Sequence, residues 1–174
     1  GHLDGKKLVS TQEMVGKIQA ALDARASEET LIIARTDARA VEGFAQAIER
    51  AWAYKEAGAD ILFVEAPQSL QEMQHICAEF SAQIPLLANM VEGGKTPISS
   101  ASELAKLGYK IAIFPGGAVR AIAHHLQAYY TGLLTHGNNQ KFSDKMHDFN
   151  GLNDLLGTKD LIELGRKYED QGNI

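Results

Sequence analysis

The heptapeptide TLIIART, residues Thr30–Thr36, decides the fold class together with three segments that repeat its character. These are DILFVEA at Asp60–Ala66, IPLLANM at Ile84–Met90 and KIAIFP at Lys110–Pro115. Each segment is almost continuously apolar rather than alternating, which is typical of a strand buried on both faces of a sheet. The segments begin 30, 24 and 26 residues apart, which is close to the length of a βαβ unit. The spacing therefore predicts parallel strands.

Amphipathic helices are predicted between these strands. A Ser followed three residues later by Glu, at Ser10, Ser69 and Ser100, indicates a capping box at the start of three of them. An Ala-rich helix is expected from Val41 to Ala57, and the longest helix from Ala118 to His136. Regular alternation of strands and helices predicts an α/β fold with a parallel sheet, either doubly wound or a (β/α)8 barrel.

The pattern changes after Gly137. Residues 1–137 form the expected β/α region, and residues 138–174 form an expected helical tail that begins with a polar loop. Short helices are predicted near Leu152–Leu156 and Lys159–Tyr168. The long helix before the loop and the polar hinge are compatible with an arm exchanged between subunits.

Composition and charge exclude several classes of function. The 174 residues are 45% hydrophobic and 22% charged, which are ordinary values for a globular chain. A net charge of −5 argues against a basic nucleic-acid-binding face, and no apolar run approaches the roughly 18 residues of a membrane span. The one cysteine, Cys77, excludes an internal disulfide framework and a Cys-cluster zinc site. We predict Cys77 to be a core residue of a cytoplasmic protein.

Two charged residues stand inside apolar strands. Right-handed crossovers place the carboxyl ends of all parallel strands at one face, where ligands bind in both candidate architectures. Arg35 and Glu65 lie near those ends, yet still within their apolar runs. A buried unpaired charge costs several kcal/mol, so such groups normally pair or hold a ligand. An arginine there suits a carboxylate or phosphate, which guanidinium binds through two parallel hydrogen bonds.

A glycine-containing loop follows the third strand. Asn89 ends that strand, and Gly93, Gly94 and Thr96 offer backbone N–H groups and a hydroxyl to an anion. Gly116-Gly117 offers the start of the longest helix in the same way. At this last site, glycines that only turn the chain are an equal alternative.

Several motifs in matching order make the sequence resemble the isocitrate lyase/phosphoenolpyruvate mutase superfamily. They are GHLDGK at 1–6, ARTDA at 34–38, VEAP at 64–67 and NMVEGGKTP at 89–97. Within it, the sequence resembles the short-chain branch that includes 2-methylisocitrate lyase, dimethylmalate lyase and carboxyphosphonoenolpyruvate mutase. The resemblance implies a (β/α)8 TIM barrel, of which this chain supplies strands five to eight and a C-terminal helical arm. It also implies a longer whole chain, a Mg²⁺ cofactor with Mn²⁺ as an alternative, and homotetramers with swapped C-terminal helices.

The resemblance also implies roles for individual residues. His2 would be the histidine of a mobile gating loop, Arg35 would grip a substrate carboxylate and stabilise enolate charge, and Glu65 would join the acid–base network. The distal carboxylate would be bound, with Arg35, by Asn89, Gly93, Gly94 and Thr96. The loop cysteine that protonates the enolate and the acidic metal ligands would precede Gly1. No metal ligand is therefore expected in this chain.

The implied activity is that of a Mg²⁺-dependent carbon–carbon lyase. It would cleave a small 2-hydroxy or 2-oxo di- or tricarboxylic acid, such as methylisocitrate or dimethylmalate, through an enolate. One alternative is a phosphonate mutase, and another is an inactive fragment or subunit that completes another chain's barrel. Strands at Thr30–Thr36 and Lys110–Pro115 would then have unpaired edges. The 174-residue chain alone is accordingly predicted to lack lyase activity and to be poorly soluble or oligomeric.

Overall fold

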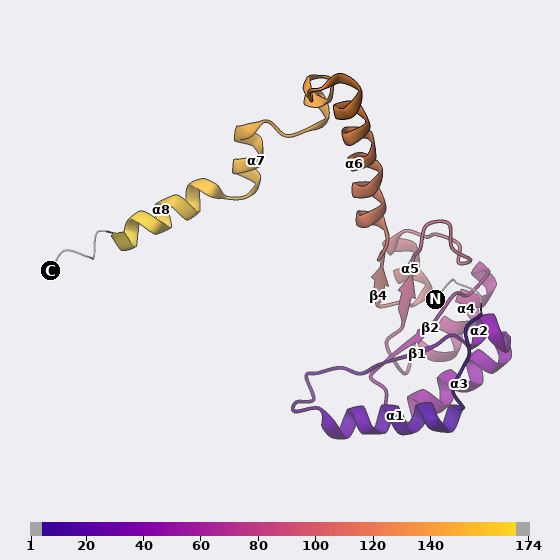
Figure 1. Cartoon of the computed structure of the whole chain (residues 1–174). Helices are drawn as coiled ribbons and strands as arrows, with labels where there is room; N and C mark the ends of the chain where they lie inside the picture. The colour runs from indigo at the N-terminus through magenta and orange to yellow at the C-terminus, as the bar shows by residue number, and fades with distance from the viewer. Residues whose placement is uncertain (1–4, 170–174) are drawn as a thin grey trace. The chain divides into compact units, whose positions relative to one another are not determined.

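The computed structural model describes residues 5–169 and alternates short strands with helices (Figure 1). The strands are β1 (Ile33–Thr36), β2 (Ile61–Val64), β3 (Leu87–Asn89) and β4 (Ile111–Ile113). The helices of the β/α region are α1 (Thr11–Ala24), α2 (Ala38–Val41), α3 (Phe44–Glu56), α4 (Leu70–Phe80) and α5 (Ala101–Leu107). Then come α6 (Gly117–His136), the 3-10 helix η1 (Gln140–Lys145), α7 (Phe149–Leu155) and α8 (Thr158–Glu169).

Most predicted helices are confirmed, but one is wrong. Instead of a single helix over Val41–Ala57, α2 ends at Val41 and α3 begins at Phe44. Gly43 separates them with φ at +111°, a backbone conformation that no residue of an α-helix adopts. The chain therefore turns at this glycine, and the Ala-rich pattern conceals the break.

Serine caps form at all three predicted helix starts, but the predicted capping box is complete only at Ser100. The side chains of Ser10, Ser69 and Ser100 each accept a hydrogen bond from the backbone N–H three residues later. At Ser100 the capping box is complete, because the Glu103 carboxylate also accepts from the Ser100 N–H at 2.8 Å. These caps fix the residue at which each helix begins. For α4 and α5 that residue lies in the loop that follows β2 or β3.

The strands are parallel and run in chain order. β1 pairs with β2, and β3 pairs with β4. A parallel bridge between Leu62 and Leu86, with the Leu62 N–H 3.0 Å from the Pro85 carbonyl oxygen, joins β2 to β3. Within residues 5–169, no strand pairs with the outer edge of β1 or of β4. The predicted parallel α/β order is thus confirmed.

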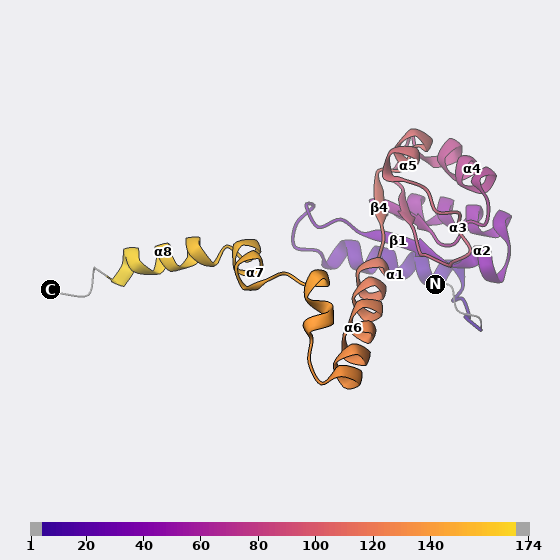
Figure 2. The ribbon, with the colours of Figure 1, turned by 90° about the horizontal axis from the view of Figure 1, so that it is seen from above.

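The strands separate two apolar clusters. On the helix side the core packs α1, α3, α4 and α5 against Ala34, Leu62 and Ala88, and Figure 2 shows these helices in an arc on one side of the strands. The opposite strand face carries the smaller cluster of Ile61, Phe63, Leu87, Ile111 and Ile113. The expectation that every strand is buried on both faces holds for β2 but not for the outer strands, since Ile33 of β1 is 46% exposed.

The chain folds into two compact units, Gly1–Ala118 and Val119–Ile174. The domain boundary expected at Gly137 stays a prediction. In the second unit, the rings of His125 and Tyr129 meet Phe142 edge-on at 5.0 and 5.3 Å. No helix within residues 5–169 is long and apolar enough to cross a membrane.

Candidate active site

The two charged strand residues and Asn89 lie on the same face of the strands. Along a strand, alternate side chains point to opposite faces. Arg35 is opposite Phe63 in the register of β1 and β2, and Glu65 stands two residues after Phe63. Asn89 stands two residues after Leu87 in β3. All three side chains therefore follow the smaller apolar cluster at the carboxyl ends of three successive strands.

The Arg35 guanidinium is held on three sides. Its Nε and Nη2 donate to the two oxygens of Asp37 at 2.8 and 3.0 Å. Its Nη2 also lies 3.4 Å from Glu65 Oε2, and its Cζ lies 4.9 Å above the centre of the Phe63 ring. With 37% of its side chain exposed, Arg35 is fixed in orientation yet open to a ligand.

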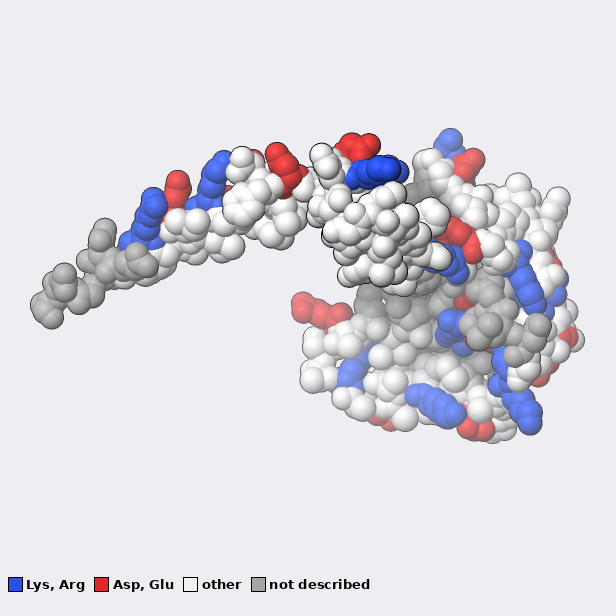
Figure 3. Space-filling view, turned by 45° about the horizontal axis from the view of Figure 1, so that its top comes forward, with Lys and Arg blue, Asp and Glu red and all other residues white. Residues whose placement is uncertain are grey.

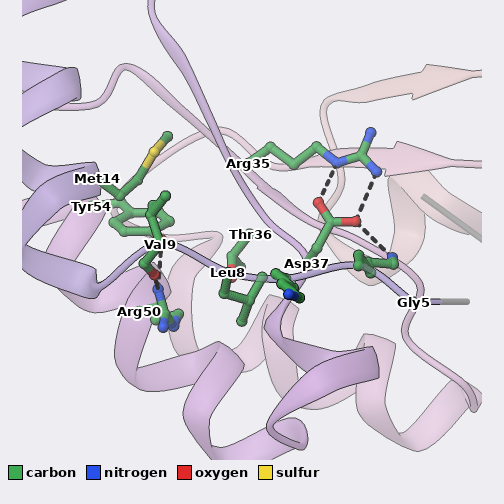
Figure 4. A pocket seen from close by; sticks show the side chains of 11 residues that line it. Gly5, Leu8, Val9, Met14, Arg35, Thr36, Asp37, Arg50 and Tyr54 are labelled. Atoms are coloured by element: carbon green, nitrogen blue, oxygen red, sulfur yellow. Dashed lines mark hydrogen bonds and ion pairs between the residues drawn. The ribbon is translucent and has the colours of Figure 1, made fainter.

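Asp37 is the main residue of this site that the sequence interpretation missed. Besides Arg35, it accepts a hydrogen bond from Lys6 Nζ at 2.8 Å (Figure 4). Burial would raise the pKa of Asp37, but the hydrogen bonds from Arg35 and Lys6 outweigh it and lower the pKa to about 2. Asp37 is therefore ionised at neutral pH. Its position two residues after Arg35 was a usable signal, because it places both side chains on one face.

Glu65 and Asn89 form the second half of the site. The Glu65 side chain is fully buried, and its two oxygens lie 3.4 and 3.3 Å from the Asn89 Nδ2 that donates to them. This contact points Asn89 Oδ1 away from the carboxylate. Within residues 5–169, two buried side-chain atoms have no hydrogen-bond partner, Asn89 Oδ1 and Thr96 Oγ1. Buried polar atoms are rarely left unsatisfied, so both indicate a ligand or solvent molecule.

A cavity of about 500 Å³ opens beside Arg35 and Asp37. Its walls come from β1, from α1 and α3, and from the segment of residues 5–9. Figure 4 shows Arg35 and Asp37 facing each other in this cavity, with Gly5 close to Asp37 and with Arg50 and Tyr54 farther along the wall. Among the predicted site residues that the structure describes, only Arg35 lines it. The cavity thus reaches the site from the side of the N-terminal segment.

Residues 2–134 match the phosphoenolpyruvate phosphomutase family. The chain belongs to this family. The 2,3-dimethylmalate lyase of Eubacterium barkeri is 42% identical to it over 97% of this chain and 57% of that protein. The 2-methylisocitrate lyase of Aeropyrum pernix is 44% identical over 98% of this chain and 55% of that protein. The chain spans about half the length of the curated relatives it matches.

Solved structures of the phosphomutase family agree with the fold. A crystal structure of 2,3-dimethylmalate lyase matches with a TM-score of 0.84 at 32% identity, over 95% of this chain and 55% of that one. Phosphonopyruvate hydrolase, in complex with oxalate and Mg²⁺, matches with a TM-score of 0.78 at 25% identity, over 95% of this chain and 59% of that one. The expected fold class is confirmed, with this chain supplying four parallel β/α units of the family's TIM-barrel-like fold.

The glycine-containing loop has its own internal contacts. The Gly94 N–H donates to the Val91 carbonyl oxygen at 2.9 Å, so this predicted anion-binding amide is already used in a turn. A Cβ atom placed on Gly117 would lie 3.0 Å from Glu92 Oε1. The carboxylate of Glu92 thus stands at the start of α6, where Gly116-Gly117 was expected to receive an anion. The Glu92 carboxylate therefore lies next to Gly117, while anion binding by these glycines stays a prediction.

Three further expectations concern His2, Cys77 and the metal ligands. His2 lies outside the described residues. Cys77 is confirmed as a core residue, being 2% exposed on the buried side of α4. Within the described part of the chain, no group of three or more His, Cys, Asp or Glu side chains lies together as a metal site. The catalytic and substrate-binding roles of Arg35, Glu65 and the loop residues stay predictions.

Proposed function

We propose that this site belongs to an enzyme that cleaves a carbon–carbon bond of a small 2-hydroxy dicarboxylic acid through an enolate. The observation that carries the proposal is the convergence of Arg35, Glu65 and Asn89 on one face at three successive strand ends, beside an unsatisfied acceptor. The names of the relatives, 2,3-dimethylmalate lyase and 2-methylisocitrate lyase, support the same class of substrate.

The donors and acceptors of the site are complementary to a 2-hydroxy acid. Among residues 5–169 the Nη1 of Arg35 has no hydrogen-bond partner, since Asp37 occupies the opposite edge, so Nη1 is available to a carboxylate and to the negative charge of an enolate. Asn89 Oδ1 is an acceptor that suits a substrate hydroxyl, and the Thr96 hydroxyl is a donor that suits a second carboxylate. The buried Glu65 carboxylate would orient Asn89 and contribute to the acid–base network.

The proposed reaction balances without an external oxidant. The hydroxyl proton passes to a base as the C2–C3 bond breaks, C2 becomes a carbonyl carbon, and the electron pair left on C3 forms an enolate. A proton then converts that enolate to the released acid, so 2,3-dimethylmalate would yield pyruvate and propionate. Mg²⁺ or Mn²⁺ is the cofactor we propose, although within residues 5–169 no group of three or more His, Cys, Asp or Glu side chains lies together to hold it.

An activity assay on two forms of the protein separates the lyase from a phosphonate mutase and from an inactive fragment. One is the 174-residue chain, and the other joins it to the part of the Eubacterium barkeri lyase that it does not match. We expect the fusion, with Mg²⁺, to release pyruvate from dimethylmalate or methylisocitrate, and the chain alone to be inactive. Turnover of phosphonopyruvate only would favour a phosphonate mutase or hydrolase. Pyruvate from none of the hydroxy acids would contradict the lyase proposal.

Substitution of Thr96 tests whether its hydroxyl binds the ligand or instead stabilises the fold. Thr96 is 5% exposed, and its Oγ1 has no partner among residues 5–169. Thr96→Val replaces this hydroxyl with a methyl group of similar size, so urea unfolding should show a stability equal to or about 1 kcal/mol above that of the unsubstituted chain. The KM of the fusion for the dicarboxylate should rise about tenfold. A large loss of stability would instead reveal a structural partner for Oγ1.

We also propose that the C-terminal helices form an arm between subunits of a homotetramer. Large apolar side chains of α7 and α8 are exposed: Phe149, Leu152, Leu155, Leu161, Ile162, Leu164 and Tyr168. In Figure 3 the charged side chains of this arm gather along one side of its visible face, with uncharged surface beside them. An apolar surface of this extent is typical of a protein–protein contact.

Charges on the apolar side of the arm should prevent that assembly. Phe149 is 84% exposed and Leu155 is 69% exposed, so neither contributes much to the packing of its own unit. Phe149→Glu with Leu155→Glu is therefore expected to lower the mass measured by light scattering, without loss of helix content. Asn150→Glu, which adds a charge at an exposed polar position of α7, is the control. An unchanged mass in the double variant would contradict the proposed arm.

A cytoplasmic location is consistent with the state of the one cysteine. Burial raises the pKa of the Cys77 thiol to about 11, although a hydrogen bond with Tyr109 lowers it. This thiol is therefore protonated and unreactive at neutral pH. We propose a cytoplasmic enzyme that acts on a small carboxylic acid.

A further inference from the structure

Asp37 occupies a helix N-cap without capping the helix. It precedes α2, yet its side chain makes no capping hydrogen bond. The Ala38 N–H instead donates a hydrogen bond to the Thr36 hydroxyl oxygen, at an N–O distance of 3.2 Å. Aspartate is common at N-caps because its carboxylate accepts from the first turn. Here that ordinary structural role is not filled, so the direction of the Asp37 side chain needs another reason.

The carboxylate is fully used by basic side chains from two parts of the chain. Oδ2 accepts from Arg35 Nε, and Oδ1 accepts from both Arg35 Nη2 and Lys6 Nζ. All three distances lie between 2.8 and 3.0 Å. Lys6 thus fixes the carboxylate from the N-terminal segment, while the carboxylate fixes the guanidinium. A planar fork held by two parallel bonds keeps one orientation.

We propose that Asp37 is the positioning residue of Arg35, which it holds with the Nη1 side of the guanidinium turned to the substrate. This inference deepens the proposed function and rests on it for the identity of the ligand. Asp37 closes the Nε edge, Phe63 lies under one face, and Glu65 approaches Nη2. Within the described residues Nη1 makes no hydrogen bond, so it is the side left for a carboxylate oxygen.

The first experiment measures the Arg35 side chain directly in the 174-residue chain. The Nε–H signal of Arg35 in ¹⁵N–¹H spectra should be sharp and protected from exchange with water, because this N–H donates a hydrogen bond to the Asp37 carboxylate. In Asp37→Asn, a carboxamide cannot accept both parallel bonds, so the signal should broaden or disappear. Asp37→Glu keeps the charge and should restore it at least in part.

Glu42 supplies a matched control. Glu42 directly follows α2 and accepts from Nε and Nη2 of Arg50 on α3 at 2.9 Å each, which is the same bidentate arrangement. Glu42→Gln should weaken the Arg50 signal and leave the Arg35 signal unchanged. A general loosening of the fold would affect both arginines in both variants, so the pair of signals distinguishes positioning from stability.

The second experiment connects this geometry to catalysis in the active fusion. Asp37→Asn should lower kcat/KM about 100-fold, which is a typical cost of a misplaced catalytic group, and Asp37→Glu should recover part of the loss. An Arg35 Nε–H signal that stays protected in Asp37→Asn would overturn the proposal. So would a lost signal with kcat/KM within about twofold of the unsubstituted fusion. If no hydroxy acid is a substrate, the proposed function fails while the spectra still decide the role of Asp37.

Discussion

Arg35→Lys is expected to lower kcat/KM of the active fusion for the dicarboxylic acid by about 10²–10³-fold, the usual cost of removing one donor that stabilises developing negative charge. Lysine keeps the positive charge, but it is a single ammonium group and not a planar fork. The lysine ammonium can pair with Asp37 or with the substrate. Arg35, in contrast, donates to Asp37 from Nε and Nη2 and still presents Nη1 to the substrate. The loss should be mainly in kcat if the contact strengthens as the enolate forms.

Arg39→Lys is the control for this substitution. Arg39 makes an equally regular contact, since its Nε lies 2.9 and 3.0 Å from the two oxygens of Glu72. That contact joins α2 to α4 and involves none of Arg35, Glu65 and Asn89. Urea unfolding should show similar small losses for the two lysine variants, while only Arg35→Lys loses activity. Activity within about threefold of the unsubstituted fusion would show that Arg35 does not contact the reacting groups.

The convergence of the site was predictable because burial of charge is costly. Arg35 and Glu65 interrupt apolar strands, and parallel topology brings successive strand ends to one face. Asn89 lies two residues after the buried Leu87, and because side chains alternate along a strand both lie on the same face. The spacing of Asp37 from Arg35 favours a shared face, but it does not show that the carboxylate contacts Arg35 rather than capping α2, a short helix that the sequence pattern did not predict. Only the direction of its side chain separates the two roles.

Other differences between expectation and structure have local causes. A glycine inside a helical pattern costs only about 1 kcal/mol, so Gly43 alone did not argue against a continuous helix. The Gly94 amide is used within its own loop, and a loop carboxylate, that of Glu92, lies at the start of α6. The internal contacts of a loop depend on its backbone conformation, which the presence of glycines and hydroxyl groups in the sequence does not predict. The helical tail was predicted more easily, since α7 and α8 follow from local patterns.

Phe80→Ala is expected to lower the free energy of unfolding by about 3–5 kcal/mol, the largest stability effect that we predict for this chain. Phe80 is fully buried at the end of α4, and its ring centre lies 4.9 Å from that of Trp52 on α3. Removing the ring leaves a cavity between two helices that both pack on the strands. Leu70→Ala, at a position 46% exposed on the same helix, should cost less than about 1 kcal/mol. Equal urea midpoints for the two variants would show that α4 does not anchor the core as its burial indicates.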